Sequence, residues 1–468
     1  MQLVAYGAQD IYLTGNPQIT FFKVVYRRHT NFSVESIEQT FNGTADFGKK
    51  VTCTISRNGD LIHKIYLETT LPSVDVSGSI SDVLLARWVN YVGEAIINYA
   101  EVEIGGQRID KHYGEWMHIW NQLTLPAGHE VGYNRLIGNI PSLIKNSWDK
   151  TSIPATKLKI PLQFWFCRNP GLALPLIALQ YHEVKINIEF AQLKDMLLLF
   201  VGDGESFSQL SPYPSNLNLT NTSLWVDYIY LDTDERRRFA QTSHEYLIEQ
   251  LQYPGEETIS SQSNKIRLNF NHPVKEIVWI SQKQACKDYK QWFNYSDRLD
   301  SSPIFANNPL GSNLLYGLIE NMTAGVTPLS IINEDIGLNT CSTSKIQLNG
   351  QDRFAERDGD YFNYVQPLDH HSRTPDVGIN VYSFGLKPEE HQPSGTCNFS
   401  RIDNANLFLT VTDNTIKTGS IYLVNNILSE SDPQGLGSSS SNAKVRVYCT
   451  NYNVLRILSG MGGLAYSN

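Results

Sequence analysis

Histidines are the first residues of this 468-residue chain that could bind a metal ion. The densest group is Asp369-His370-His371, and His112 and His118 lie six residues apart. Zinc hydrolases often carry H-E-x-x-H on one helix, but His182-Glu183 and His244-Glu245 are each followed by the wrong partner. We therefore interpret the histidines as polar loop residues and predict no metal site.

Carboxylates gather around Gly359, where Glu356, Asp358 and Asp360 lie close in sequence. Clustered carboxylates on a turn suit calcium, but this spacing does not fit an EF-hand loop. A pair of acids could also hydrolyse a glycosidic bond, yet the sequence gives no separation between them. We interpret the segment as a solvated turn, and we predict no catalytic residue, no bound cofactor and no enzymatic activity.

The glycine-rich segment Gly460-Met461-Gly462-Gly463 has the composition of a phosphate-binding loop. Such a loop needs a helix N-terminus behind it, and the sequence to Asn468 leaves no room for one. Glycine also allows tight turns and close backbone approach. We expect a tight turn that packs closely against other parts of the chain.

Glycan attachment is the one modification that the sequence suggests. Asn294, Asn321 and Asn398 each begin an N-x-[ST] sequon in the second half, although such sequons occur about as often as chance allows. The N-terminal residues carry no signal-peptide pattern, which argues against the secretory route. These asparagines are our candidate glycan attachment sites.

Four tryptophans lie within apolar patterns and could anchor a core or a subunit interface. A carbohydrate-stacking platform is the alternative for this set: Trp116, Trp120, Trp165 and Trp279.

Two similar halves must position these residues. Residues 103–119 and 347–364 share a strand, a glycine turn with Gln, a charged stretch and a Gly-acid-aromatic segment. This order predicts a β-hairpin in each half. Two further strand patterns recur: residues 51–67 correspond to 266–280, and residues 183–190 correspond to 406–411. We therefore infer a duplicated β-rich module.

Composition supports an all-β fold. Aromatic residues make up 11% of the chain and charged residues only 18%, and the net charge of −9 disfavours direct binding to nucleic acid. The six scattered cysteines include no C-x-x-C, so we expect buried thiols in a reducing compartment, and no apolar stretch approaches ~20 residues, so we predict no membrane insertion.

The order of the segments suggests domain boundaries. We predict an N-terminal arm over residues 1–25, a first domain over 26–231, a connector over 232–244 and a second domain over 245–468. Asp232 and Glu235 have N-cap and N3 spacing for a short helix in the connector. The segments 303–337 and 432–442 have loop composition.

Three motifs along the chain carry a resemblance. The segments Ala8–Phe22, Asp232–Ala240 and Ser459–Asn468 resemble the major capsid protein family of nucleocytoplasmic large DNA viruses. The resemblance spans essentially the whole chain. It implies two consecutive eight-stranded jelly-roll barrels with short connecting helices.

The resemblance also implies a function. The chain would form a homotrimer, a pseudo-hexagonal capsomer that contacts neighbouring capsomers in an icosahedral virion. The N-terminal arm would reach minor capsid proteins beneath the shell, and this late protein would assemble in the host cytoplasm. The alternatives are a glycan-binding or glycan-processing double-barrel protein, and a minor capsid or penton component.

Overall fold

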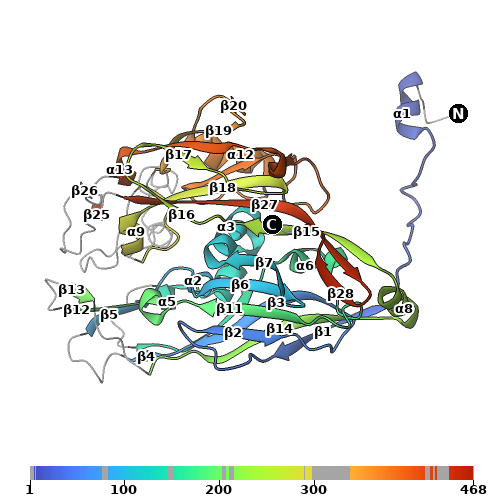
Figure 1. Ribbon diagram of the computed structural model, residues 1–468, viewed down its shortest axis with the longest axis horizontal. Coiled ribbons are helices and arrows are strands. Elements are labelled where there is room, and N and C mark those ends of the chain that lie inside the picture. Colours follow the sequence, from blue (N-terminus) through green and yellow to red (C-terminus); the bar gives the residue numbers. More distant parts are fainter. Residues whose placement is uncertain are drawn as a thin grey trace.

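Antiparallel strands build two stacked halves in the computed structural model (Figure 1). The structure describes residues 5, 7–75, 83–144, 152–202, 207–209, 216–288, 290–297, 338–416, 422–424, 427–429 and 442–466. The predicted loop 303–337, all of the predicted loop 432–442 except Asn442, and Asn321 lie outside these residues.

The first half is built around two facing sheets. One has the order β1-β14-β3-β10 with β9 also paired to β3, and the other has the order β2-β11-β6-β7. Their bounds are β1 (Phe32–Gln39), β2 (Lys50–Thr54), β3 (Leu61–Leu71), β6 (Ile97–Ile104), β7 (Gln107–Tyr113), β9 (Thr156–Pro161), β10 (Leu174–Pro175), β11 (Val184–Phe190) and β14 (Thr220–Leu231).

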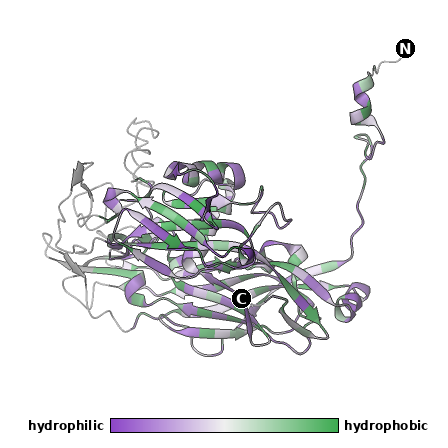
Figure 2. Ribbon diagram, turned by 45° about the horizontal axis from the view of Figure 1, so that its top comes forward, coloured by the Kyte–Doolittle hydropathy of each residue, from purple (hydrophilic) through white to green (hydrophobic). Residues whose placement is uncertain are grey.

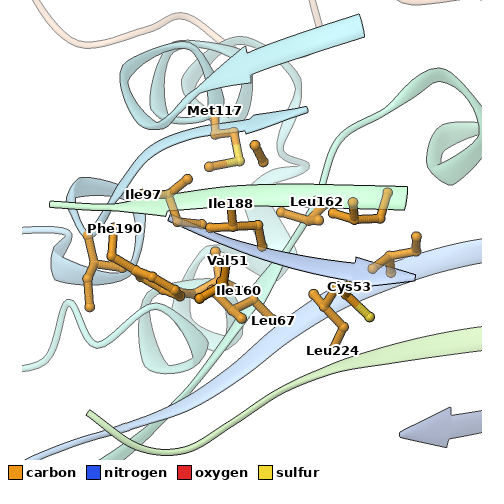
Figure 3. Packing of buried hydrophobic residues seen from close by; sticks show 14 of the residues in the cluster. Val51, Cys53, Leu67, Ile97, Met117, Ile160, Leu162, Ile188, Phe190 and Leu224 are labelled. Atoms are coloured by element: carbon orange, nitrogen blue, oxygen red, sulfur yellow. The ribbon is translucent and has the colours of Figure 1, made fainter. Parts of the chain in front are cut away.

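Alternating apolar side chains fill the space between these sheets. Hydrophobic and hydrophilic residues alternate along the strands (Figure 2), as expected where one face of each strand is buried. Val51, Leu67, Ile188 and Leu224 meet in the core (Figure 3), and each is at most 3% exposed.

The second half repeats this connectivity. Its sheets have the orders β15-β27-β18-β22 and β17-β24-β19-β20, with short strands added at their edges. Their bounds are β15 (His244–Gln252), β16 (Glu256–Ile259), β17 (Ser263–Arg267), β18 (Pro273–Lys283), β19 (Cys341–Leu348), β20 (Gln351–Asp352), β21 (Arg357–Asp358), β22 (Ile379–Ser383), β23 (Cys397–Asn398), β24 (Ala405–Val411), β27 (Ala443–Leu458) and β28 (Met461–Leu464). The predicted duplication is therefore confirmed.

Helices and short strands connect these sheets. The helices that lie close to the strands are α2 (Val92–Ala95), α3 (Gly114–Thr124), α4 (Glu130–Leu136), α5 (Pro141–Ile144), α6 (Trp165–Arg168), α7 (Leu193–Met196), α8 (Thr233–Gln241), α9 (Gln284–Asp288), η5 (Tyr361–Val365), α12 (Gln366–His370) and α13 (Asp413–Ile416). The remaining short strands are β4 (Val74–Asp75), β5 (Val83–Trp88), β8 (Ser152–Ile153), β12 (Leu197–Gly202), β13 (Phe207–Gln209), β25 (Tyr422–Val424) and β26 (Ile427–Ser429).

The matching turns have the same backbone geometry. Gly105 and Gly106 between β6 and β7 have φ of 57° and 84°, and Asn349 and Gly350 between β19 and β20 have φ of 50° and 81°. A two-residue hairpin turn with positive φ at both positions favours glycine and asparagine. Both predicted hairpins are confirmed.

One strand match needs a correction. The alternation over residues 266–270 predicts a strand equivalent to β2, but β17 runs over Ser263–Arg267 and ends before Leu268. Beyond it, the Leu268 amide still donates to Ala405 at 2.9 Å, and His272 adopts φ of 63° as the chain turns into β18. The turn ends the ladder earlier than the alternation of residues suggests.

The connector helix has the predicted cap. Asp232 accepts a hydrogen bond from the Glu235 amide at 2.9 Å, which satisfies an amide of the first turn of α8. Arg236 on this helix also forms an ion pair with Asp60 of the first half at 3.0 Å.

The N-terminal segment leaves the body of the molecule (Figure 1). Among its described residues, the short helices are η1 (Ala8–Asp10) and α1 (Ile11–Thr14), and residues 15–31 belong to no helix or strand. Tyr12, Phe21 and Phe22 are 90–99% exposed. An apolar segment that contacts so little of its own chain has the character of an interaction arm.

Candidate assembly surfaces

Helix α3 joins the two halves. Its apolar face consists of Trp116, Ile119, Trp120 and Leu123, spaced as expected for one side of a helix. This face packs on the outer surface of the second-half sheet, against Val278, Ile280, Ile379, Val381 and Tyr448. Met117 points the other way, into the first-half core.

A buried ion pair lies at the start of this helix. Glu115 from the first half and Arg446 from β27 are 2.7 Å apart, and Tyr295 donates a hydrogen bond to Glu115 at 3.2 Å. Arg446 also pairs with Glu256 at 2.6 Å. Burial lowers the pKa of Arg446, but Glu115, together with Tyr448, Tyr295 and Glu256, outweighs burial and holds that pKa above its usual value.

Glu256 is the shared carboxylate of this cluster. Burial raises its pKa, but Lys287 and Arg446 outweigh burial and lower the pKa to about 2. Glu256 is therefore ionised near neutral pH, and it lies between two cationic side chains of the second half.

Two further polar contacts cross between the halves. Asp110 of β7 accepts a hydrogen bond from the Leu251 amide of β15 at 3.0 Å. Arg168 of α6 and Lys275 of β18 both pair with Glu249, at 3.1 and 2.7 Å. Hydrogen-bonded and paired charges of this kind fix one relative position, because separating them would leave buried groups unsatisfied.

The glycine-rich C-terminal segment forms the predicted tight, closely packed turn. Gly460 has φ of 80°, and its carbonyl accepts from the Tyr181 amide at 3.0 Å. Gly462 donates its amide to His182 Nδ1 at 3.2 Å, and a Cβ at Gly462 would lie 2.7 Å from Leu179. Strand β28 thus holds the second half against a loop of the first (Figure 1).

The histidines differ from our interpretation as polar loop residues. His112 lies in β7 and His118 in α3, and each is at most 3% exposed. His112 pairs with Asp110 at 2.8 Å and His118 with Glu94 at 2.7 Å. Each ring can be buried because a carboxylate pairs with it. The spacing of histidines in the sequence does not reveal these partners.

The interpretation is also wrong for His371. Its side chain is fully buried, with Nε2 2.9 Å from Glu276 and Nδ1 3.0 Å from Glu389. Burial lowers the pKa of His371, but the two carboxylates outweigh burial and raise it to about 9. His370 instead faces the Leu386 carbonyl at 3.0 Å. Within the described ranges, no three His, Cys, Asp or Glu side chains are placed to hold a metal ion.

The acidic turn around Gly359 is exposed. Glu356 accepts a hydrogen bond from Thr343 at 2.5 Å, and Asp358 accepts one from the Tyr361 amide at 3.1 Å. Asp360 is also exposed. Glu356 and Asp358 thus stabilise the turn and the start of the helix that follows through these hydrogen bonds.

The candidate glycan sites differ in accessibility. Asn398 is exposed, and its side chain accepts from the Ser400 amide at 3.1 Å. Asn294 is half-buried and accepts from Ser296 Oγ at 2.8 Å. Attachment at these residues, as at Asn321, stays a prediction.

The tryptophan and cysteine side chains are mostly buried. Trp116, Trp120, Trp165 and Trp279 are at most 5% exposed, so none presents a face for sugar stacking. The six cysteines are all free thiols, and only Cys397 is partly exposed. No described helix has the length and apolar character required to cross a bilayer.

Comparison with known proteins matches both halves. The family described as "Major capsid protein N-terminus" matches residues 20–232, and that described as "Large eukaryotic DNA virus major capsid protein" matches residues 235–463. The chain belongs to the major capsid proteins of large eukaryotic DNA viruses. It is a structural protein of the icosahedral capsid, as the resemblance implied.

Relatives in this capsid family match along their whole length. The chain is 49% identical to the major capsid protein of Phaeocystis pouchetii virus and 43% identical to that of Paramecium bursaria Chlorella virus 1, covering 100% of this chain and 99% of each relative. A chain of the PBCV-1 virus capsid superimposes with a TM-score of 0.73 at 38% identity, covering 96% of this chain and 100% of that one. The Faustovirus major capsid protein, 13% identical, shares the fold with a TM-score of 0.69 over 97% of this chain and 94% of that one.

These comparisons confirm the double jelly-roll fold and a non-enzymatic capsid role. They do not support the glycan-binding or glycan-processing alternative or the minor capsid alternative. The predicted domain boundaries stay a prediction.

We predict that Glu115→Ala lowers the free energy of unfolding by about 2 kcal/mol, because the buried Arg446 loses one of its two carboxylate partners and Tyr295 loses its acceptor. Urea unfolding of the purified protein measures this change. The control is Glu245→Ala, which removes an exposed pair with Arg456 and should cost less than about 1 kcal/mol. Equal losses in the two variants would contradict a special role of the buried pair.

We predict a pH-dependent contribution from His371. Its pKa lies near 6.5 in the unfolded chain and at about 9 in the folded one. Its stabilisation is therefore fully present below pH 6.5 and is lost as the pH rises through 9, with a total of roughly 3 kcal/mol.

Urea unfolding at several pH values should show the advantage of the native protein over His371→Gln shrinking from pH 6 to pH 9. His370→Gln, which lacks the buried carboxylate partners, is the matched control. A pH-independent difference for His371→Gln would refute the assignment.

Proposed function

We propose that this capsid protein forms a homotrimer that serves as a pseudo-hexagonal capsomer. The internal duplication carries this proposal, because three copies of a chain with two similar barrels present six similar walls. Closed rotational symmetry is the usual form of soluble homo-oligomers. Neighbouring capsomers would then meet through these walls to tile the virion.

We propose that the chain is divided into an arm over residues 1–25, jelly rolls over 26–231 and 245–468, and a connector over 232–244. Support comes from the strand pairs, because every described pair lies within 32–231 or within 244–464. The arm would tie the capsomer to minor capsid proteins beneath the shell. Its exposed aromatic side chains supply the apolar area that such contacts bury.

The proposed setting is the host cytoplasm, with the protein made late in infection and incorporated into the virion. Free, largely buried cysteines suit a reducing compartment. The net charge of −9 argues against direct contact with the genome.

We predict that the purified native protein has a mass near three times 52.9 kDa. Light scattering at several concentrations measures this mass directly. A stable value near three chains supports the capsomer, and a concentration-independent mass of one chain contradicts it.

We predict that trypsin cleaves the arm rapidly in free capsomers and slowly in intact virions. Lys23, Arg27 and Arg28 are exposed in a segment without helix or strand, so they are open to the protease until the arm is covered. Mass spectrometry of timed digests measures the cleavage. Capsomers released from the same virions are the control, and equal rates in both samples would place the arm outside the shell.

A further inference from the structure

The duplication places two helices at equivalent positions. Helix α3 follows the first glycine-turn hairpin, and η5 with α12 follows the second. Aligning Gly114 with Gly359 pairs the residues of the α3 apolar face, in order, with Tyr361, Tyr364, Val365 and Leu368. The same alignment pairs Met117 with Phe362, and each of these two is buried in the core of its own half. The alignment therefore matches the core-facing residue of each helix.

The two helices differ in what covers them. The α3 face is buried against the second-half sheet. On the second helix, Tyr364 and Val365 are each 41% exposed and Leu368 is 75% exposed. Tyr361, the first residue of the set, packs instead against the core of the second half. The part of the equivalent face formed by Tyr364, Val365 and Leu368 thus lies open to solvent in a single chain.

Strand register identifies the surface equivalent to the one that α3 covers. In the second half, Val278 pairs with both Tyr448 and Val381. In the first half, Tyr66 pairs in the same way with Trp225 and Pro161. The equivalent surface is therefore the outer face of β3, β14 and β9, which we call the Tyr66 face.

The Tyr66 face is suited to receive a helix. The rings of Tyr66 and Trp225 stack with an interplanar angle of 4° and centroids 6.3 Å apart, and both side chains are half-buried. A cavity of 630 Å³ borders this face. It is lined by Lys64, Lys159 and Pro161, and also by Asp227, by Trp120 of α3 and by Glu389 of the second half.

Charge favours the same pairing. Lys64 and Lys159 are exposed on the Tyr66 face, and Asp360 and Asp369 are exposed at either end of the second helix. Asp360 also occupies the position of Glu115, the carboxylate that pairs with Arg446 beneath α3. Opposite charges orient a docking helix, although Lys159 also lies 3.6 Å from Glu68 and Asp227 borders the same cavity.

We propose that a second copy of this chain covers the Tyr66 face by packing its Tyr364, Val365 and Leu368 there. This contact between copies is equivalent to the packing of α3 on the second-half sheet within one chain. It is head-to-tail, since each copy offers one helix and one Tyr66 face, and such contacts close into a ring when the rotation allows it. This inference rests on the proposed trimer and names its interface.

Single variants test each side of the contact. Leu368→Asp places a charge on the helix, and Tyr66→Asp places one on the receiving face. Each should reduce the light-scattering mass from three chains to one at a concentration where the native protein is trimeric. Leu458→Asp is the matched control, because Leu458 is also exposed, at 63%, but lies at the end of β27.

A mixture of the two variants gives a sharper test. Tyr66→Asp keeps an intact helix and Leu368→Asp keeps an intact Tyr66 face, so an equimolar mixture should form a pair of chains that cannot grow further. A mass near twice 52.9 kDa is therefore expected. Misfolded variants would not restore association on mixing.

Three outcomes would overturn the interface. The single variants could remain trimeric, the Leu458→Asp control could dissociate equally, or the mixture could stay monomeric. If the native protein itself is monomeric, the proposed trimer fails as well, so the two failures are distinguishable.

Discussion

The burial of α3 between the two halves is the constraint on which the rest of the structure depends. Its apolar face supplies the packing, and Glu115 supplies a charge that must meet Arg446 once both leave water. Apolar contact alone tolerates sliding, whereas a buried ion pair with hydrogen-bonded neighbours does not. The two barrels are therefore held as one body, a requirement for a subunit whose edges must match those of its neighbours.

Local features of the fold can be predicted from the sequence. The hairpins at Gly106 and Gly350 and the cap at Asp232 depend on residues close together in the chain. The duplication is also visible, because the same strands recur in the same order. The predicted end of β17 is wrong, because the alternation of apolar residues continues past Arg267 although the strand pairing does not.

The contacts between the halves cannot be predicted in this way. Glu115 and Arg446 are far apart in sequence, and a strand that faces a core has the same alternation as one that faces another domain. The interpretation of His118 and His371 fails for a related reason, since the carboxylates that allow their burial come from other elements. The candidate assembly surfaces emerge only when strand register is combined with exposure.

The position of β28 has a consequence for biosynthesis. Residues 461–464 leave the ribosome after both sheets of the first half, yet they pack on the loop that contains Tyr181 and His182. A nascent chain can therefore fold its first barrel early, but the β28 contact is added to those of α3 only after translation has passed Gly462. Chains terminated before Gly462 would therefore lack one of the contacts that hold the two halves together.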